Sequence, residues 1–173
     1  IGIAFKTFKG VKRRMEIIKE FKIKNLKLKI IDDYAHHPEE IKATLAALKE
    51  RYPNYKILAI FQPHTFSRTK ALLKAFGQCF QKADFVYLLP TFSSAREKKP
   101  KQNIDKLLFE EVSKYHRNVK SLPFNFKLLS SEINKLLTSK FYILNSFIIL
   151  TLGAGDVYKI AMKFTNKLKD DKL

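Results

Sequence analysis

Short apolar runs alternate with helix-length amphipathic segments along most of this chain, and the alternation restricts the folds that it can adopt. The apolar, β-rich runs predict strands at residues 26–31, 56–61, 85–90, 125–129 and 146–153. Apolar residues at helical spacing predict helices at residues 38–52, 67–80, 103–117, 131–140 and 155–168. Strands and helices that alternate in this way form a parallel sheet covered by helices on both faces. We therefore predict an α/β fold with a mostly parallel sheet.

Two of the predicted helices have clear start signals. Pro38 suits a first helical turn, because its missing N–H would be unpaired there in any case. Glu39 and Glu40 follow it and favour the positive end of the helix dipole. Ser67 is the predicted N-cap of the second helix.

Polar or glycine-rich loops follow four of the predicted strands. They occupy residues 32–38, 62–69, 91–99 and 153–156. In parallel sheets, ligands bind at the carboxyl ends of the strands. We therefore expect these four loops to meet at one edge of the sheet and to carry the chemistry.

Composition places the sequence among ordinary globular domains. Of its 173 residues, 46% are hydrophobic, which allows a sizeable core and argues against wholesale disorder. No apolar run reaches the ~18–20 residues of a membrane helix, and basic residues interrupt the opening segment where a signal peptide would be apolar. The single cysteine, Cys79, excludes an internal disulfide and predicts a small core residue. We expect a cytoplasmic protein without a membrane partner.

The formal net charge of +18 raises the question of a polyanionic partner. A nucleic-acid-binding module would cluster its basic residues and interleave them with base-stacking aromatics. Here the lysines are scattered, mostly on the polar faces of predicted helices. A bias of the whole sequence toward Lys, Ile, Phe and Asn, as in AT-rich genomes, accounts for the charge. We expect no nucleic-acid partner and keep such a module as an alternative.

The glycines do not form a phosphate-binding loop. A Walker motif needs two glycines five residues apart followed by Lys and Ser or Thr, and no pair of the five glycines fits. Gly153 and Gly155 supply G-x-G, but Tyr158 stands where the dinucleotide fingerprint G-x-G-x-x-G requires its third glycine. We predict that the chain has no complete nucleoside triphosphate site. The two glycines either form a tight turn or let a ligand approach the backbone.

The stretch DDYAHHPEEI concentrates titratable side chains in the first loop. Zinc sites favour histidines at i and i+4 or ligands from several elements, and adjacent His36 and His37 fit neither pattern. We predict no metal site; the histidines either receive a carboxylate or phosphate or make structural hydrogen bonds. Asp32 and Asp33 face opposite sides of a strand, which disfavours a shared acid–base pair. A hydrogen bond from a ribose hydroxyl to one of them is more natural.

Two arginines in the later loops are candidate anion ligands. Arg68 lies in the first turn of its predicted helix, where its guanidinium and the backbone N–H groups together would clamp a carboxylate. The alternative is a solvated surface arginine. Arg96 either serves a ligand or pairs with Glu97 and orders the third loop.

Together these motifs resemble the C-terminal domain of the Mur ligases. DDYAHHPEEI, FQPHTFSRT, AREK and TLGAGDVYKI occur in the family's order, and the resemblance runs from about Phe8 to about Ala161. It implies a Rossmann-like domain that swings in as a lid, presents an amino acid and completes a nucleotide site. FKGVKRRME is similar to the segment that closes the family's central ATP-binding domain. We therefore expect residues 1–25 to be the tail of that domain and residues 26–173 to be the C-terminal domain.

The resemblance also implies a reaction. In this family ATP phosphorylates the carboxylate of a UDP-sugar, and the amino group of the incoming substrate attacks the acyl phosphate. The motifs are most similar to those of members that add L-alanine to UDP-N-acetylmuramate in bacterial peptidoglycan synthesis. The cofactors would be ATP and Mg²⁺, bound mainly by N-terminal and central domains that this chain lacks. We expect the chain alone to be inactive.

The implied ligand contacts fall into two groups, and no catalytic residue is among them. Contacts with the nucleotide are implied for Arg14, Asp33 and Tyr34, and Asp33 would hold the ribose. Contacts with the amino-acid substrate are implied for His36, Arg68, Gly153 and Gly155. Many members carry a second arginine where this chain has Thr65, which puts a two-arginine clamp in doubt.

The nearest alternative within the family is the recycling ligase that joins a ready-made tripeptide to the same UDP-sugar. It shares the stretch with the two adjacent histidines, so that stretch does not discriminate. QPHTFSRT is similar to the alanine-adding members and favours them.

Overall fold

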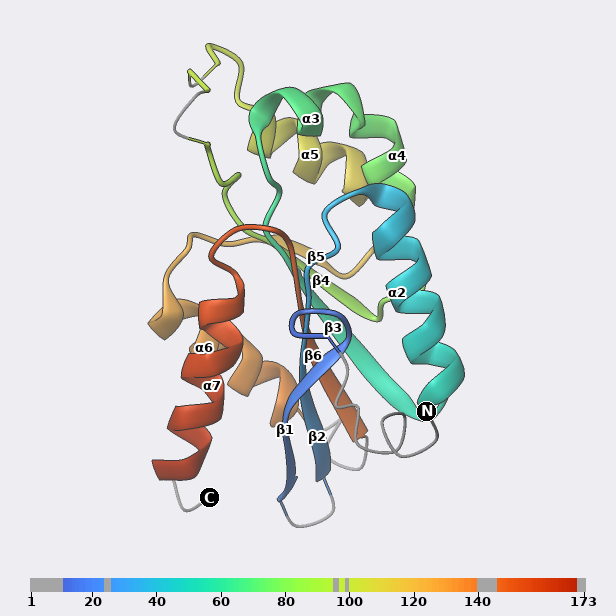
Figure 1. Cartoon of the computed structure of the whole chain (residues 1–173), viewed down its shortest axis with the longest axis vertical. Coiled ribbons are helices and arrows are strands. Elements are labelled where there is room, and N and C mark those ends of the chain that lie inside the picture. The colour runs from blue at the N-terminus through green and yellow to red at the C-terminus, as the bar shows by residue number, and fades with distance from the viewer. Residues whose placement is uncertain (1–10, 24–25, 95–96, 99, 140–145, 171–173) are drawn as a thin grey trace, which may run out of the picture.

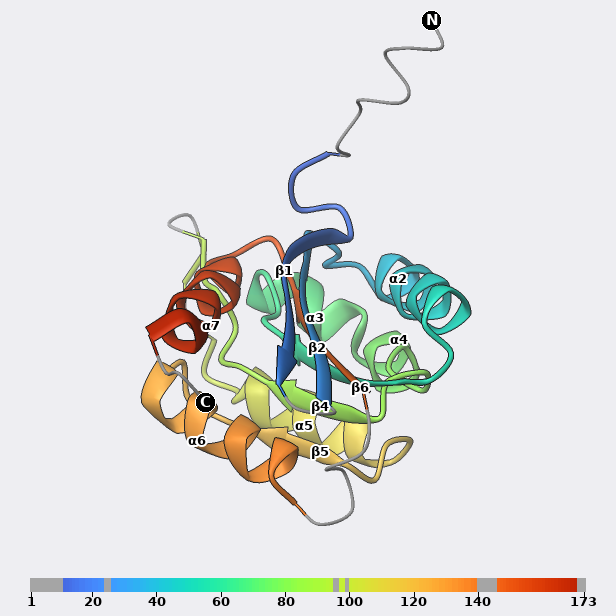
Figure 2. The same cartoon turned by 90° about the horizontal axis from the view of Figure 1, so that it is seen from below.

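A six-stranded sheet forms the centre of the protein, and helices cover both of its faces (Figures 1 and 2). The computed structural model describes residues 11–23, 26–94, 97–98, 100–139 and 146–170. The strand order is β1-β2-β6-β3-β4-β5, with β1 antiparallel to β2 and the other neighbours parallel. The strands are β1 Glu16–Ile23, β2 Leu26–Asp33, β3 Tyr55–Phe61, β4 Phe85–Leu88, β5 Val119–Ser121 and β6 Ser146–Leu152. The predicted mostly parallel α/β fold is confirmed.

The helices divide between the two faces of the sheet, as Figure 2 shows. One face carries α2 Pro38–Arg51, α3 Phe66–Ala71, α4 Leu73–Gln78 and α5 Ile104–Ser113. The other face carries α6 Phe126–Leu137 and α7 Tyr158–Asp170. This arrangement leaves the carboxyl ends of the parallel strands open for the loops that follow them.

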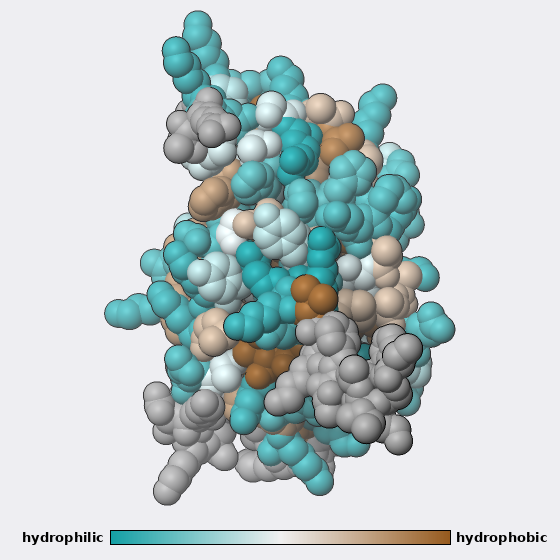
Figure 3. Space-filling model, in the orientation of Figure 1, coloured by the Kyte–Doolittle hydropathy of each residue, from teal (hydrophilic) through white to brown (hydrophobic). Residues whose placement is uncertain are grey.

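Two hydrophobic cores hold these layers together. On the first face, Ile41, Leu45 and Leu48 of α2 recur at helical spacing and are buried against alternate residues of the strands. Cys79 is buried in the same core, as predicted, and burial raises the pKa of its thiol. On the second face, buried apolar residues of α6 and α7 pack against the intervening strand residues. The surface in Figure 3 is mainly hydrophilic, with small, separated apolar patches.

The strand predicted at 125–129 is wrong. Asn125 is the N-cap of α6 instead, and its side-chain oxygen accepts a hydrogen bond from the N–H of Leu128 at 3.2 Å. Leu129 and Ile133 are buried one helical turn apart, so packing on the sheet favours the helix. The strand beside β4, at one edge of the sheet, is β5, three residues that follow α5 after a short turn.

The helix predicted from Ser67 to about residue 80 also differs. Its N-cap is Thr65, two residues before the predicted cap, so the helix begins at Phe66 and Ser67 lies in the first turn. Thr65 has a left-handed φ of 66° and makes no side-chain capping bond. Leu72 departs from helical geometry and divides the segment into α3 and α4.

The basic segment before residue 26 contains a strand that the sequence pattern did not reveal. This strand, β1, pairs with β2 along its length, and the register shifts between Ile17 and Lys19. A bulge of this kind breaks the alternation of apolar and polar residues by which strands are recognised. The domain boundary near residue 25 remains a prediction, but β1 completes the same sheet. No helix in the described part of the chain is long and apolar enough to cross a membrane.

Candidate functional site

The loops after the strands meet at the carboxyl edge of the sheet, as predicted, and backbone hydrogen bonds join them. The N–H of Gly153 donates to the carbonyl of Asp33 at 3.2 Å, which ties the fourth loop to the first. The N–H of Phe92 donates to the carbonyl of Pro63 at 2.8 Å, which ties the third loop to the second. The N–H of Gln62 bonds to the end of β6 at 3.0 Å. The edge is therefore one connected surface.

A buried carboxylate, Asp32, lies at the centre of this edge and is 1% exposed. Its Oδ1 accepts a hydrogen bond from Thr151 Oγ1 at 2.5 Å, and its Oδ2 pairs with Arg13 Nε at 3.0 Å. Burial raises the pKa of Asp32, although the hydrogen bonds from Thr151 and Arg13 oppose that shift. Asp32 therefore anchors Arg13 and is closed to solvent.

Arg13 connects three parts of the edge. Its Nη2 donates to the carbonyl of Gly153 at 2.6 Å, while Nε holds Asp32. Its guanidinium lies 4.9 Å from the ring centre of Tyr34 and 4.8 Å from that of Tyr158. Arg13 has a left-handed φ of 58°, a strained conformation that these contacts hold in place.

The residues implied for nucleotide binding lie beside Arg13. The guanidinium of Arg14 is 5.7 Å from the ring centre of Tyr34. Asp33 is 3% exposed, and its two carboxylate oxygens accept bonds from the N–H groups of Met15 at 2.8 Å and Ala35 at 2.7 Å. The structure therefore brings the three predicted residues together and gives Asp33 a structural role as well.

The two adjacent histidines have different roles. His37 is the N-cap of α2: its Nδ1 accepts a hydrogen bond from the N–H of Glu39 at 3.3 Å, and its own N–H donates to Glu40 Oε2 at 3.2 Å. Burial alone would raise the pKa of Glu40, but bonds from the N–H groups of His36 and His37 lower it. These reciprocal bonds form a capping box, which makes His37 a structural residue.

We expect His37→Ala to lower the free energy of unfolding by about 1 kcal/mol, because it removes one side of the capping box. Urea denaturation measures this loss. The matched control is His36→Ala, which leaves both capping bonds in place and should cost less than half as much. Equal losses in the two variants would contradict the assignment.

His36 points toward the second loop instead. Its Nδ1 lies 3.1 Å from the carbonyl of Tyr34 and 3.5 Å from Glu40 Oε2. Its ring lies edge-on to the ring of His64, with centroids 6.2 Å apart. Because Nδ1 faces two acceptors, it is the protonated nitrogen, and Nε2 is free to face a ligand.

Three buried polar atoms of the second loop have no hydrogen-bond partner among the described residues. They are Gln62 Oε1, His64 Nδ1 and Arg68 Nη1. The ring of His64 stacks on Phe92 with centroids 5.6 Å apart, and burial together with the positive charge of Arg68 lowers the pKa of His64. An unpaired buried polar group costs about 1–3 kcal/mol, so three of them close together make this loop a candidate ligand site.

Glu97 caps the N-terminus of α3 from the third loop. Its oxygens accept hydrogen bonds from the N–H groups of Phe66 and Ser67, both at 2.7 Å. A clamp in which Arg68 shares a ligand with these backbone groups is therefore wrong, because Glu97 already occupies them. Arg96, the predicted partner of Glu97, lies outside the described residues.

The two glycines of the fourth loop are required by close packing. Gly153 has a φ of 139°, and a Cβ there would lie 2.6 Å from the carbonyl oxygen of Gln62. A Cβ on Gly155 would lie 2.8 Å from Gln62 Oε1 and 2.9 Å from the ring of Phe92. The tight-turn interpretation therefore holds, and both glycines help to shape the space around Gln62.

Pattern reasoning missed several residues of this edge. Gln62 and His64 lie in the quoted loop QPHTFSRT, so only their burial and unpaired atoms single them out. Arg13 precedes the predicted Arg14, and spacing alone does not show which of the two faces the sheet. In the described part of the chain, no three His, Cys, Asp or Glu side chains are grouped as metal ligands.

Comparison with known proteins matches this chain to one protein family. The family model described as "Mur ligase, glutamate ligase domain" matches residues 13–137. Among curated proteins, the UDP-N-acetylmuramate–L-alanine ligase of Lactiplantibacillus plantarum is 40% identical over 162 residues, which are 94% of this chain and 33% of that protein. The enzyme of the same name from Clostridium kluyveri is 40% identical over 165 residues, with the same coverage of 94% and 33%.

Solved structures agree on the fold. The UDP-N-acetylmuramate–alanine ligase of Thermotoga maritima superposes with a TM-score of 0.68 at 25% identity. The match covers 98% of this chain and 33% of the Thermotoga chain. A murein peptide ligase of Psychrobacter arcticus gives a TM-score of 0.62 at 20% identity, with 96% and 32% covered. The chain thus spans about a third of the length of the curated relatives that it matches.

Proposed function

This chain belongs to the Mur ligase family, and we propose that it is the C-terminal domain of an ATP-dependent ligase that adds L-alanine to UDP-N-acetylmuramate in bacterial peptidoglycan synthesis. The names of the curated relatives support this choice of substrate. In the proposed protein, N-terminal and central domains complete the enzyme, which works in the cytoplasm. The 173-residue chain supplies the side of the site that meets the incoming amino acid.

One observation carries the proposal: the three unpaired atoms of the second loop complement a free amino acid. Arg68 Nη1 is a cationic donor and matches a carboxylate. Gln62 Oε1 is an acceptor and matches the amine, which keeps a lone pair for attack on the acyl carbon. His64 stays neutral near pH 7, because its pKa is lowered, so it adds no charge beside the amine. A ligand that satisfies all three would be fixed at both of its polar ends.

The remaining edge residues suit a nucleotide in the proposed enzyme. Arg14 lies beside the ring of Tyr34, which supports the proposal that both contact it. The carboxylate oxygens of Asp33 each have a second acceptor position, which a ribose hydroxyl would use. Arg13 and Asp32 hold this group in place without touching the ligand.

ATP and Mg²⁺ are the proposed cofactors, and this domain does not fit the metal. The described residues contain no grouped metal ligands, and the sequence has no phosphate-binding loop. The ATP phosphates and the metal are therefore held mainly by the other proposed domains. ATP supplies the phosphoryl group that activates the sugar carboxylate. The part of this domain is to bind the amino acid, to orient it and to exclude water from the closed site.

The recycling ligase is the alternative within the family. It would place a tripeptide, rather than a single amino acid, against the second loop. Similarity to the murein peptide ligase supports the shared fold only, because the identity is 20%. The curated relatives named above favour alanine.

We expect the 173-residue chain to show no ligation by itself and the protein with restored upstream domains to be active. The test follows phosphate release with UDP-N-acetylmuramate, ATP, Mg²⁺ and L-alanine. Release by the longer protein that requires all three substrates supports the proposal. Ligation by the isolated chain would overturn the division of labour between the domains, and no release by a folded longer protein would overturn the proposed function.

A further inference from the structure

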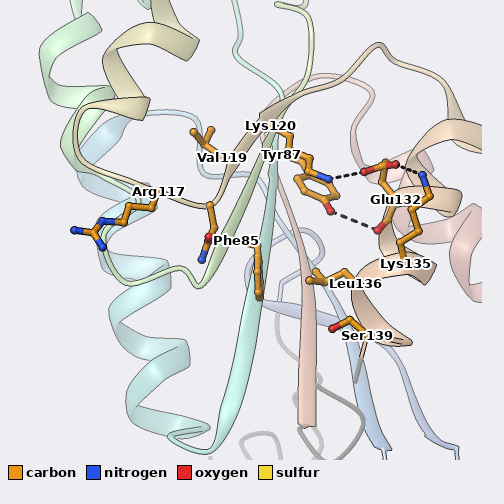
Figure 4. Close-up of a pocket in the computed structure, with 10 residues that line it drawn as sticks. Phe85, Tyr87, Arg117, Val119, Lys120, Glu132, Lys135, Leu136 and Ser139 are labelled. Atoms are coloured by element: carbon orange, nitrogen blue, oxygen red, sulfur yellow. Dashed lines mark hydrogen bonds and ion pairs between the residues drawn. The ribbon is translucent and has the colours of Figure 1, made fainter. Parts of the chain in front are cut away.

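A pocket of about 350 Å³ lies at the opposite end of the sheet from the candidate site (Figure 4). Phe85 and Val119, which begin β4 and β5, line it, whereas the site described above follows the last residues of the strands. Leu136, near the end of α6, closes its other side. The pocket is therefore separate from the proposed ligase site, and no role described so far uses it.

The walls of the pocket are mainly apolar. Phe85, Tyr87, Val119 and Leu136 supply aromatic rings and aliphatic groups from two strands and a helix. The hydroxyl of Tyr87 has a long bond, 3.5 Å, to the carbonyl of Glu132, and burial raises the pKa of this phenol to about 12. The phenol therefore stays neutral and does not repel an anion. A pocket of this size and lining suits the body of a small organic molecule.

Two exposed lysines, bridged by Glu132, lie at the rim of these walls. Glu132 accepts hydrogen bonds from Lys120 at 2.6 Å and from Lys135 at 2.8 Å, as Figure 4 shows. These two bonds lower the pKa of Glu132 to about 2, so its carboxylate remains charged and pairs with both ammonium groups. Each ammonium has three donors and uses one of them on Glu132. The remaining donors are available to an anion at the rim.

The charge at the rim is not balanced by acids that line the pocket. Lys120, Lys135 and Arg117 carry three positive charges, and Glu132 is the one carboxylate among the described lining residues. In Figure 4 Arg117 lies on the opposite side of Phe85 from the two lysines, and its guanidinium points away from the apolar walls. Ser139 Oγ is buried at the pocket and has no hydrogen-bond partner among the described residues. An unpaired hydroxyl in the pocket lining favours a ligand with an acceptor atom.

We propose that this pocket binds a small amphipathic anion, with an aromatic or aliphatic body between β4, β5 and α6 and a carboxylate, sulfonate or phosphate group at Lys120 and Lys135. The body would replace water along the apolar walls. The anionic group would bond to the free ammonium donors, in competition with Glu132. This inference does not depend on the proposed ligase activity.

The test compares two fluorescent probes with the same kind of aromatic body. 8-Anilinonaphthalene-1-sulfonate carries a sulfonate, whereas N-phenyl-1-naphthylamine has no charge. We expect the charged probe to bind the purified protein about tenfold more tightly, because only it uses the lysine donors. Equal affinities, or no binding of the charged probe up to about 1 mM, would overturn the proposal.

Three substitutions locate the binding. Lys120→Gln and Lys135→Gln should each weaken the charged probe about fivefold and leave the uncharged probe unchanged. Glu132→Gln should instead tighten the charged probe about threefold, because it removes the competing carboxylate. Lys42→Gln, an exposed lysine on α2, is the control and should change neither affinity. No effect of Glu132→Gln, or equal effects of Lys42→Gln and Lys120→Gln, would assign the binding to another surface.

Discussion

Arg13→Met should lower the free energy of unfolding by about 3 kcal/mol, because it breaks a buried ion pair. The change removes the cationic partner of Asp32, which is 1% exposed. It also removes the bond to Gly153 and both ring contacts of the guanidinium. Methionine fills most of the volume of the arginine side chain, so the loss of stability measures the contribution of the charge and the hydrogen bonds of Arg13. Urea denaturation measures it.

The loss caused by Arg13→Met should depend on pH. Burial already raises the pKa of Asp32 in the folded protein above its value in the unfolded chain. Such a group destabilises the fold as pH rises through the window between its unfolded and folded pKa values. Without Arg13 the folded pKa rises further, so this window extends upward and the loss at pH 7 should exceed the loss at pH 5. Adding Asp32→Asn should recover much of the stability. A loss that is equal at both pH values would show that Asp32 is not the cause.

Arg68→Ala, in the protein with all its domains, should raise the KM for L-alanine about tenfold to hundredfold. A charge-assisted bond to a carboxylate is worth about 1.5–3 kcal/mol, which corresponds to this range. The fold should lose little, about 0.5 kcal/mol or less, because no described group pairs with Arg68 Nη1. The variant thus separates a ligand-binding arginine from a structural one.

Two further variants sharpen the Arg68 test. Arg68→Lys keeps the charge but not the planar fork, and its KM should lie between those of the parent and Arg68→Ala. Arg51→Ala, an exposed arginine at the end of α2 beside Tyr52, is the matched control and should leave KM unchanged. An unchanged KM in Arg68→Ala would remove this residue from the amino-acid site. A large loss of stability would make it structural.

The fold was predictable where hydrophobic spacing is long and regular. Ile41, Leu45 and Leu48 give α2 its inward face, and the buried runs of β3 and β6 read as central strands. The predictions were wrong or incomplete where contacts with distant parts of the chain determine the local secondary structure. Asn125 and the apolar residues after it fit a strand or a capped helix equally well, and only packing against the sheet selects α6. The bulge in β1 hides its alternation in the same way.

The location of the candidate site was predictable, but its internal contacts were not. The rule that ligands bind at carboxyl ends of parallel strands selects the loops without any contact information. This rule does not predict that Glu97, 30 residues from Ser67 in the sequence, accepts a hydrogen bond from its N–H at the N-terminus of α3. Nor does it show that Arg13, next to the predicted Arg14, is the arginine that Asp32 holds. Such pairs depend on how separate loops fold together.

The choice of amino-acid substrate tests the central claim most directly. The measurement is phosphate release by the protein with all its domains, supplied with UDP-N-acetylmuramate, ATP and Mg²⁺ and either L-alanine or the murein tripeptide. We expect turnover with L-alanine alone, because the unpaired atoms of Gln62 and Arg68 match a single amino acid. Turnover only with the tripeptide would contradict it and would assign the domain to the recycling ligase.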